Sequence, residues 1–145
     1  MPRSALATAL LLAATLTAAA PTDPTAKLRL VPFPKKVTLA EGTFALGGDL
    51  VLDAPRGCGA HLGGLLAGEL RTAGAPEPRL VLHDAAAHYL RLSRKPGRAA
   101  PALRFRKGAG EEDYVLEVRP NEVLCGAPRT AGLLHAAATL RQLIR

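Results

Sequence analysis

The chain is 145 residues long, which gives room for one domain, and its hydrophobic content of 48% excludes disorder as the default state. Aromatic residues make up only 3% and Trp is absent, which argues against a surface that stacks sugar rings or bases on exposed aromatic side chains. The formal net charge of +7 comes from basic residues scattered without a run of five like charges, so we interpret it as solvated basic faces rather than a patch for nucleic acid or another polyanion.

The first twenty residues are typical of a secretory signal peptide. Met1–Arg3 supplies one positive side chain, Ala5–Leu16 is apolar, and small residues occupy the −3 and −1 positions before a cleavage point near Ala20. A membrane-spanning helix needs roughly 20 apolar residues, and this run is shorter. We therefore predict a signal peptide at residues 1–20, a mature domain at 21–145, a secreted or periplasmic location, and no membrane attachment after cleavage.

The next segment predicts extended structure. Leu28–Pro34 contains two prolines, each of which disfavours helical backbone in the residue before it. Val37–Leu39 and Phe44–Leu46 flank Glu41-Gly42, a spacing that suits a hairpin or two short strands around a turn. Leu50–Leu52 is expected to form a third strand.

The hydrophobic period then changes to that of a helix. Apolar residues recur at spacings of three and four and predict a helix from about Ala60 to Thr72: Leu62, Leu65, Leu66, Leu70 and Ala73. Three glycines inside this stretch, Gly63, Gly64 and Gly68, each weaken it by up to ~1 kcal/mol relative to Ala, unless they permit close packing on a sheet. Gly74 is a natural stop.

Further strands are expected in the second half. Leu80–Leu82 is a short apolar run, and Tyr89–Leu92 and Leu103–Arg106 alternate apolar with basic residues, which places the guanidinium groups in water. Tyr114–Val118 and Val123–Cys125 are separated by a short turn and should pair with each other.

The chain closes on an apolar-striped segment, Thr130–Arg145, that predicts a second helix. Leu133, Ala137, Leu140 and Ile144 lie on one face at helical spacing. Strands interrupted by two helices, with hairpin connections, indicate an α+β fold: a mostly antiparallel β-sheet with two helices packed on one face.

Candidates for chemistry are sparse. His83 next to Asp84 lies at a strand end, and we expect no catalytic or ligand role for it or for the other histidines, His61, His88 and His135. The acidic triplet Glu111–Asp113 is interpreted as a solvated turn rather than as paired catalytic carboxylates. We predict no catalytic residue, no metal site and no cofactor.

Two cysteines, Cys58 and Cys125, leave two alternatives open. In an exported protein they could form a single disulfide, and they are equally compatible with two buried free thiols. Neither belongs to a CxxC motif or to a zinc-ligand spacing.

Three segments in series resemble a known family. "LVPFPKKVTLAEGTFAL" (30–46) is similar to the opening of β-N-acetylhexosaminidases of glycoside hydrolase family twenty, and "EDYVLEVRPNEVLCGA" (112–127) is similar to their E-x-Y-x-L-x-V hairpin. "AGLLHAAATLRQLI" (131–144) resembles their closing helix, with matches at Gly132, Thr139, Leu140, Gln142 and Leu143. The sequence departs from the pattern at Cys125, where an apolar residue is usual, and in a longer stretch at 85–109.

The resemblance implies a non-catalytic role. In that family this region is an N-terminal accessory domain, an antiparallel sheet covering two helices. A TIM barrel follows it and holds the catalytic Asp–Glu pair, which hydrolyses terminal β-linked N-acetylhexosamines with help from the substrate's own N-acetyl group. No barrel motif occurs in this sequence, so no catalytic residue is carried over. We expect the chain to be inactive alone, to stop where the barrel would begin, and to have a barrel as its partner, in cis or from a split gene.

Two alternatives remain. One is a free-standing secreted module that binds glycans or polyanions through Arg91, Arg94, Arg104 and Arg106. The other is the similar accessory domain that precedes other glycosidase barrels, including hyaluronidase-like enzymes.

Overall fold

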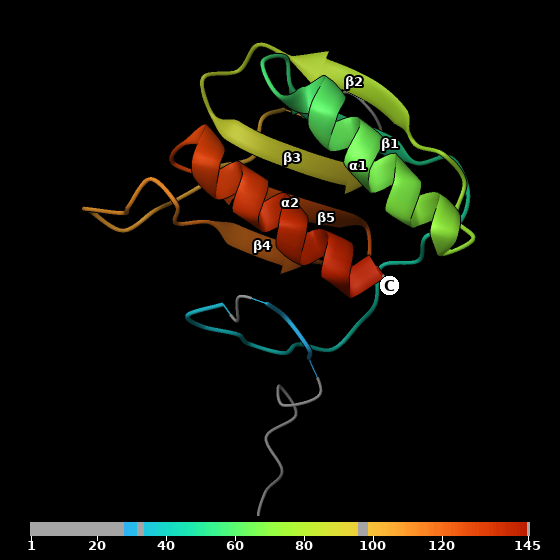
Figure 1. Ribbon diagram of the computed structural model, residues 1–145, viewed down its shortest axis with the longest axis horizontal. Coiled ribbons are helices and arrows are strands. Elements are labelled where there is room, and N and C mark those ends of the chain that lie inside the picture. Colours follow the sequence, from blue (N-terminus) through green and yellow to red (C-terminus); the bar gives the residue numbers. More distant parts are fainter. Residues whose placement is uncertain (1–27, 32–33, 96–98, 145) are drawn as a thin grey trace, which may run out of the picture.

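The structure is a computed structural model that describes residues 28–31, 34–95 and 99–144, so the predicted signal peptide lies outside it. In chain order the elements of the described residues are β1 (Val51–Pro55), α1 (Gly59–Thr72), β2 (Arg79–His83), β3 (His88–Ser93), β4 (Val115–Val118), β5 (Glu122–Ala127) and α2 (Thr130–Ile144). The strands form one sheet in the order β2-β1-β3-β5-β4 (Figure 1).

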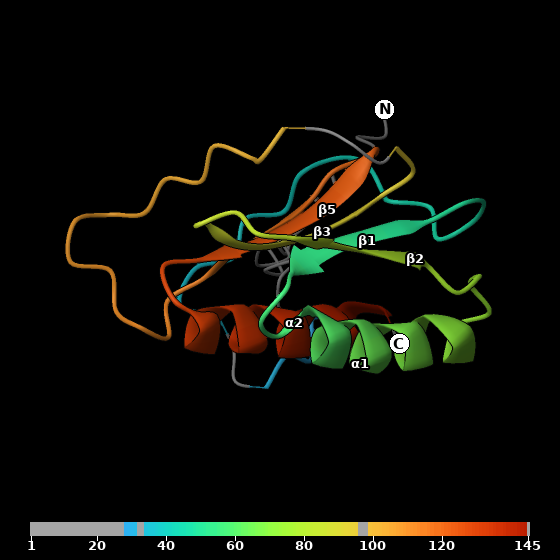
Figure 2. The ribbon, with the colours of Figure 1, turned by 90° about the horizontal axis from the view of Figure 1, so that it is seen from above.

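The sheet is mixed but mostly antiparallel. β1 and β2 run parallel and are connected through α1, whereas β1–β3, β3–β5 and β4–β5 are antiparallel pairs. Both helices lie side by side on one face of the sheet (Figure 2). The predicted fold class is therefore confirmed, but β4–β5 is the one hairpin among the described strands, since the neighbours β1–β3 and β3–β5 are not consecutive in the chain.

Both predicted helices are present, and α1 ends where its glycine predicts. Gly74 has a φ of 77°, a left-handed conformation that favours glycine. The N–H of Ala75 then donates to the carbonyl oxygen of Leu70 at 2.8 Å, which satisfies one of the last helical carbonyls.

Three predicted strands are wrong. Val37–Leu39, Phe44–Leu46 and Leu103–Arg106 are not paired into the sheet. Phe44 and Leu46 nevertheless pack against the core. Alternating apolar residues indicate that one side of a segment is buried. An extended segment that packs against the rest of the protein is buried on one side in the same way, without hydrogen bonds to a neighbouring strand.

Leu103 shows how this works. A Cβ on Gly126 would lie 2.6 Å from both methyl carbons of Leu103, so the missing side chain of Gly126 leaves the space that Leu103 fills. The segment that carries Leu103 begins on the face of the sheet opposite the helices (Figure 2). Every residue of β5 is consequently buried, because the strand is covered on both faces.

The core lies between the sheet and the helices. Its largest fully buried side chains are Leu52, Leu62, Leu66, Leu70, Leu90, Leu92, Leu133 and Cys125. Burying a leucine side chain contributes roughly 1.5–3 kcal/mol. This set therefore provides the main hydrophobic stabilisation of the domain.

The acidic triplet is more than a solvated turn, because Asp113 is a hydrogen-bonding centre. Its carboxylate accepts from Gly110 N at 2.9 Å, from Lys35 Nζ at 3.0 Å and from an Arg106 guanidinium nitrogen at 3.4 Å. The Gly110 hydrogen bond and then the Lys35 ammonium hold the pKa of Asp113 below its ordinary value. Glu111 is exposed as expected, and its carbonyl oxygen accepts from Gly132 N at 3.0 Å.

Candidate functional site

Two of the four histidines, His83 and His88, contact neighbouring residues of the fold. His83 ends β2, stacks on the ring of Tyr89 with centroids 4.0 Å apart, and has its Nε2 3.1 Å from the Tyr89 carbonyl oxygen. Asp84 does not pair with its neighbour His83; an Arg56 guanidinium 2.7 Å away holds its carboxylate and lowers the pKa of Asp84.

The remaining histidines lie on or beside the helices. His88 Nδ1 is 3.4 Å from the hydroxyl of Thr130 at the start of α2. His61 and His135 are exposed on α1 and α2.

Arg91 corrects the expectation that the strand guanidinium groups lie in water. It is only 3% exposed, and one terminal nitrogen donates to Asp53 Oδ2 at 2.9 Å. The other terminal nitrogen donates to the carbonyl oxygen of Ala99 at 3.1 Å, and the guanidinium carbon lies 5.7 Å from the centre of the Tyr89 ring. Arg91 therefore holds the loop that follows β3 onto the sheet.

Two other arginines that were candidates for binding glycans or polyanions also make contacts within the chain. Arg94 donates to the carbonyl oxygen of Ala45 at 3.0 Å, and Arg106 lies 3.4 Å from Asp113. With Arg91, three of the four candidate guanidinium groups are engaged in holding segments together, and the glycan- or polyanion-binding module is not favoured.

Cys58 and Cys125 are free thiols, one half-buried and one buried. Burial raises the pKa of Cys58, and complete burial raises the pKa of Cys125 to about 12. Cys125 fills a position in the core of β5 as an apolar residue would.

Within residues 28–31, 34–95 and 99–144, no group of three or more His, Cys, Asp and Glu side chains is placed to hold a metal ion. In the same part of the chain, neither helix combines the length and the apolar content that crossing a bilayer requires.

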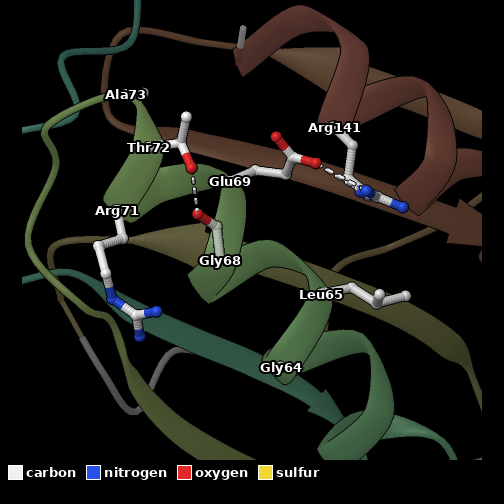
Figure 3. Close-up of a pocket in the computed structure, with 8 residues that line it drawn as sticks. All are labelled: Gly64, Leu65, Gly68, Glu69, Arg71, Thr72, Ala73 and Arg141. Atoms are coloured by element: carbon white, nitrogen blue, oxygen red, sulfur yellow. Dashed lines mark hydrogen bonds and ion pairs between the residues drawn. The ribbon is translucent and has the colours of Figure 1, made fainter.

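A shallow groove lies on the outer face of the helix layer, the face turned away from the sheet (Figure 3). Its volume is about 820 Å³, and its lining comes from α1 and the turn after it, together with one side chain of α2: Gly64, Leu65, Gly68, Glu69, Arg71, Thr72, Ala73 and Arg141. Arg141 donates to Glu69 Oε1 through two nitrogens, at 2.6 and 3.1 Å, and so fixes α2 against α1 at the edge of the groove.

The glycines of α1 divide between the two faces of the helix. A Cβ at Gly59 would lie 2.6 Å from a Leu82 methyl carbon, and one at Gly63 would lie 3.2 Å from Leu80, so these two let α1 approach the sheet. The expectation of close packing is thus confirmed for Gly63. Gly64 and Gly68, in contrast, have no atom within 4 Å of such a Cβ.

The outer face is also partly apolar. Leu65 is 36% exposed and Leu134 is 42% exposed, and Ala138 is exposed between the last two turns of α2. Glycines inside a helix cost about 1 kcal/mol each relative to Ala, and packing among the described residues does not explain Gly64 and Gly68. Small side chains, exposed leucines and an open groove make this face suited to packing against another protein surface.

The fold defines a small α+β domain, with two helices on one face of a mostly antiparallel sheet. The chain matches the family model of glycosyl hydrolase family 20, domain 2, over residues 27–145, and it belongs to that family. Domain 2 is the non-catalytic accessory domain of the family's hexosaminidases, and it normally accompanies a catalytic barrel domain. No curated protein and no solved structure gives a significant match.

The sequence carries one signal for the outer face that is not a motif. Gly64 and Gly68 are four positions apart and therefore lie on the same side of α1. Leu134 lies next to Leu133, outside the apolar stripe of α2. Glycines off the core face of a helix were the available indication of a second packing surface.

Proposed function

We propose that the chain is the accessory domain of an exo-acting β-N-acetylhexosaminidase, which removes terminal β-linked N-acetylhexosamines from glycans outside the cytoplasm. One observation carries the proposal: a domain whose family normally accompanies a catalytic barrel has an open groove on its helix layer. In this proposal the barrel cleaves the glycosidic bond, and this chain supports the barrel without contributing a catalytic group.

The docking face follows from the same groove. An apolar ridge of the barrel enters over Gly64 and Gly68, where missing side chains allow close backbone approach, and it buries Leu65 and Leu134. The Glu69–Arg141 pair at the groove edge keeps the two helices in register while the partner binds. Interfaces between domains of this kind commonly bury about 600–1,500 Å².

Export is the second part of the proposal, since the substrate glycans are proposed to be extracytoplasmic. The charged, apolar and small-residue regions of positions 1–20 support it. The mass of the exported protein tests it: an N-terminus at Pro21 is expected, and a retained Met1 would contradict signal cleavage.

An activity assay tests the division of labour. The purified chain is expected to release no aryl product from an aryl N-acetyl-β-glucosaminide, whereas a family-20 barrel hydrolyses it. Turnover that stays with the chain through successive purification steps, at a constant specific activity, would contradict the proposal.

A binding assay tests the docking face. Gly68→Leu places a helix-favouring side chain in the groove where a Cβ has no neighbour within 4 Å, so the fold should tolerate it. We expect it to weaken binding to a separately purified family-20 barrel at least tenfold in Kd. Gly47→Leu is the matched control, because Gly47 is equally open and lies outside the helices. Equal binding by both variants would exclude the groove as the docking face.

A further inference from the structure

The segment Leu28–Val31, which we call the strap, lies beside α2 instead of joining the sheet (Figure 1). It passes on the outer side of the helix layer, below α2 in Figure 2. Gln142, in the last turns of α2, accepts from the N–H of Val31 through Oε1 at 2.8 Å. The Nε2 of Gln142 donates to the carbonyl oxygen of Val31 at 3.0 Å. One side-chain amide thus pairs with both polar groups of Val31, as a neighbouring strand would.

The side-chain amide of Gln142 suits this pairing. It offers a donor and an acceptor in one plane, whereas a carboxylate accepts only and an apolar side chain does neither. Gln142 Nε2 also lies 3.3 Å from the carbonyl oxygen of Ala138, one turn earlier in α2, which orients the amide toward the strap. Leu30 is 8% exposed, so the strap inserts one side chain into the protein while the clamp fixes its backbone.

The result of this clamp is an exposed apolar side chain at a fixed position. Val31 is 77% exposed, the highest value among the exposed large hydrophobic residues, and Leu143, next to Gln142, is 37% exposed. A single exposed valine needs no explanation in a mobile segment. Here, however, two hydrogen bonds hold the backbone of Val31 against the outside of the helix layer, the face that carries the groove.

We infer that the strap is part of the surface that docks the catalytic barrel, with Val31 as a contact residue and Gln142 as the residue that positions it. This inference rests on the proposed function, and it extends the docking face from the groove across the end of α2. The clamp fixes the strap before the partner arrives, so that ordering it does not reduce the affinity.

The experiment titrates a separately purified family-20 catalytic barrel into the wild-type chain and three variants and measures Kd by calorimetry. Val31→Ser removes an exposed side chain and should weaken binding about tenfold, the loss expected for a buried valine. Gln142→Ala should weaken binding about three- to tenfold. Val118→Ser is the matched control: Val118 is 48% exposed and lies on β4, in neither a helix nor the strap, and the substitution should leave Kd unchanged.

A second measurement separates positioning from folding. In the free chain, Gln142→Ala should accelerate hydrogen exchange of the Val31 amide while the unfolding temperature stays near that of wild type, since the substitution releases a strap and not the core. Wild-type binding with equal Kd for Val31→Ser and Val118→Ser would overturn the inference and leave the proposed function standing. Failure of the wild-type chain to bind the barrel would overturn both.

Discussion

The two faces of the helix layer differ at neighbouring positions of the same helices. Leu133 is fully buried and Leu134 is 42% exposed; Gly63 lies against Leu80, whereas Gly64 has open space where a side chain would be. On the inner face, the core of this chain explains Leu133 and Gly63. On the outer face, Leu134 and Gly64 belong to the docking face proposed for the catalytic barrel.

The largest expected difference between interior and surface concerns the two thiols. Cys125 faces the helices from β5 and is inaccessible, so its modification requires opening of the core, whose free energy is about 5–15 kcal/mol in ordinary domains. We expect a maleimide to label Cys58 at least ~10³-fold faster than Cys125, measured by mass spectrometry. Comparable rates would show that the core beneath the helices is not closed.

The same thiol predicts a loss of stability in alkali. The pKa of Cys125 rises from its ordinary value of 9.0 to about 12 in the folded state. Between these values the unfolded chain releases a proton that the folded chain keeps, so stability is complete below pH 9 and falls as the pH rises toward 12. Urea unfolding at pH 8 and pH 10.5 measures this, and Cys125→Ala should reduce the difference.

Leucine truncation compares the two faces directly. Leu133→Ala should lower the free energy of unfolding by about 3 kcal/mol, because it opens a cavity in the core. Leu134→Ala should change it by less than about 0.5 kcal/mol, because that side chain is exposed. Chemical denaturation measures both. Equal losses would mean that Leu134 is buried and that the outer face is not available for docking.

Glycine substitution at the start of α2 should have the next largest effect. A Cβ at Gly132 would overlap the carbonyl oxygen of Asp113 and contact Ala127 Cβ at 2.9 Å. Backbone atoms cannot move aside as a flexible side chain can, so Gly132→Ala should destabilise the domain by about 1–3 kcal/mol. A neutral result in thermal unfolding would show that the loop before β4 is not held against α2.

The smallest predicted effect has the opposite sign. Gly64→Ala and Gly68→Ala should each stabilise the free chain by about 0.5–1 kcal/mol, since Ala favours the helix and meets no atom at either position. Both should weaken barrel binding if the groove is the docking face. A stabilised variant that binds normally would assign these glycines no role in recognition.

Much of the fold was readable from the sequence because its elements carry their own periodicity. The leucines of α1 and the stripe of α2 repeat at helical spacing, and β3, β4 and β5 appear as apolar runs bounded by turns. The strand predicted at Leu103–Arg106 is wrong because alternation indicates only that one side of a segment is buried. In this protein Leu103 is a loop residue that packs against Gly126, and that contact accounts for the pattern.

The candidate site was less readable because its residues depend on contacts across the chain. The burial of Arg91 follows from Asp53 on β1 and from a carbonyl in the next loop, and neither contact has a local signature. The family resemblance marks Gln142 only as a matching residue. Its physical role, the clamp on Val31, joins residues 111 positions apart.

That separation has a consequence for the order of assembly. The β4–β5 hairpin and the α1 crossover close short loops, whereas the strap reaches its place only after α2, the last element, has formed. Contacts between distant parts of a chain form late because the entropy of loop closure opposes them. The strap should therefore dock onto a domain that is already folded, and a pull on the amino terminus or a protease would release it first, with sheet and helices still intact.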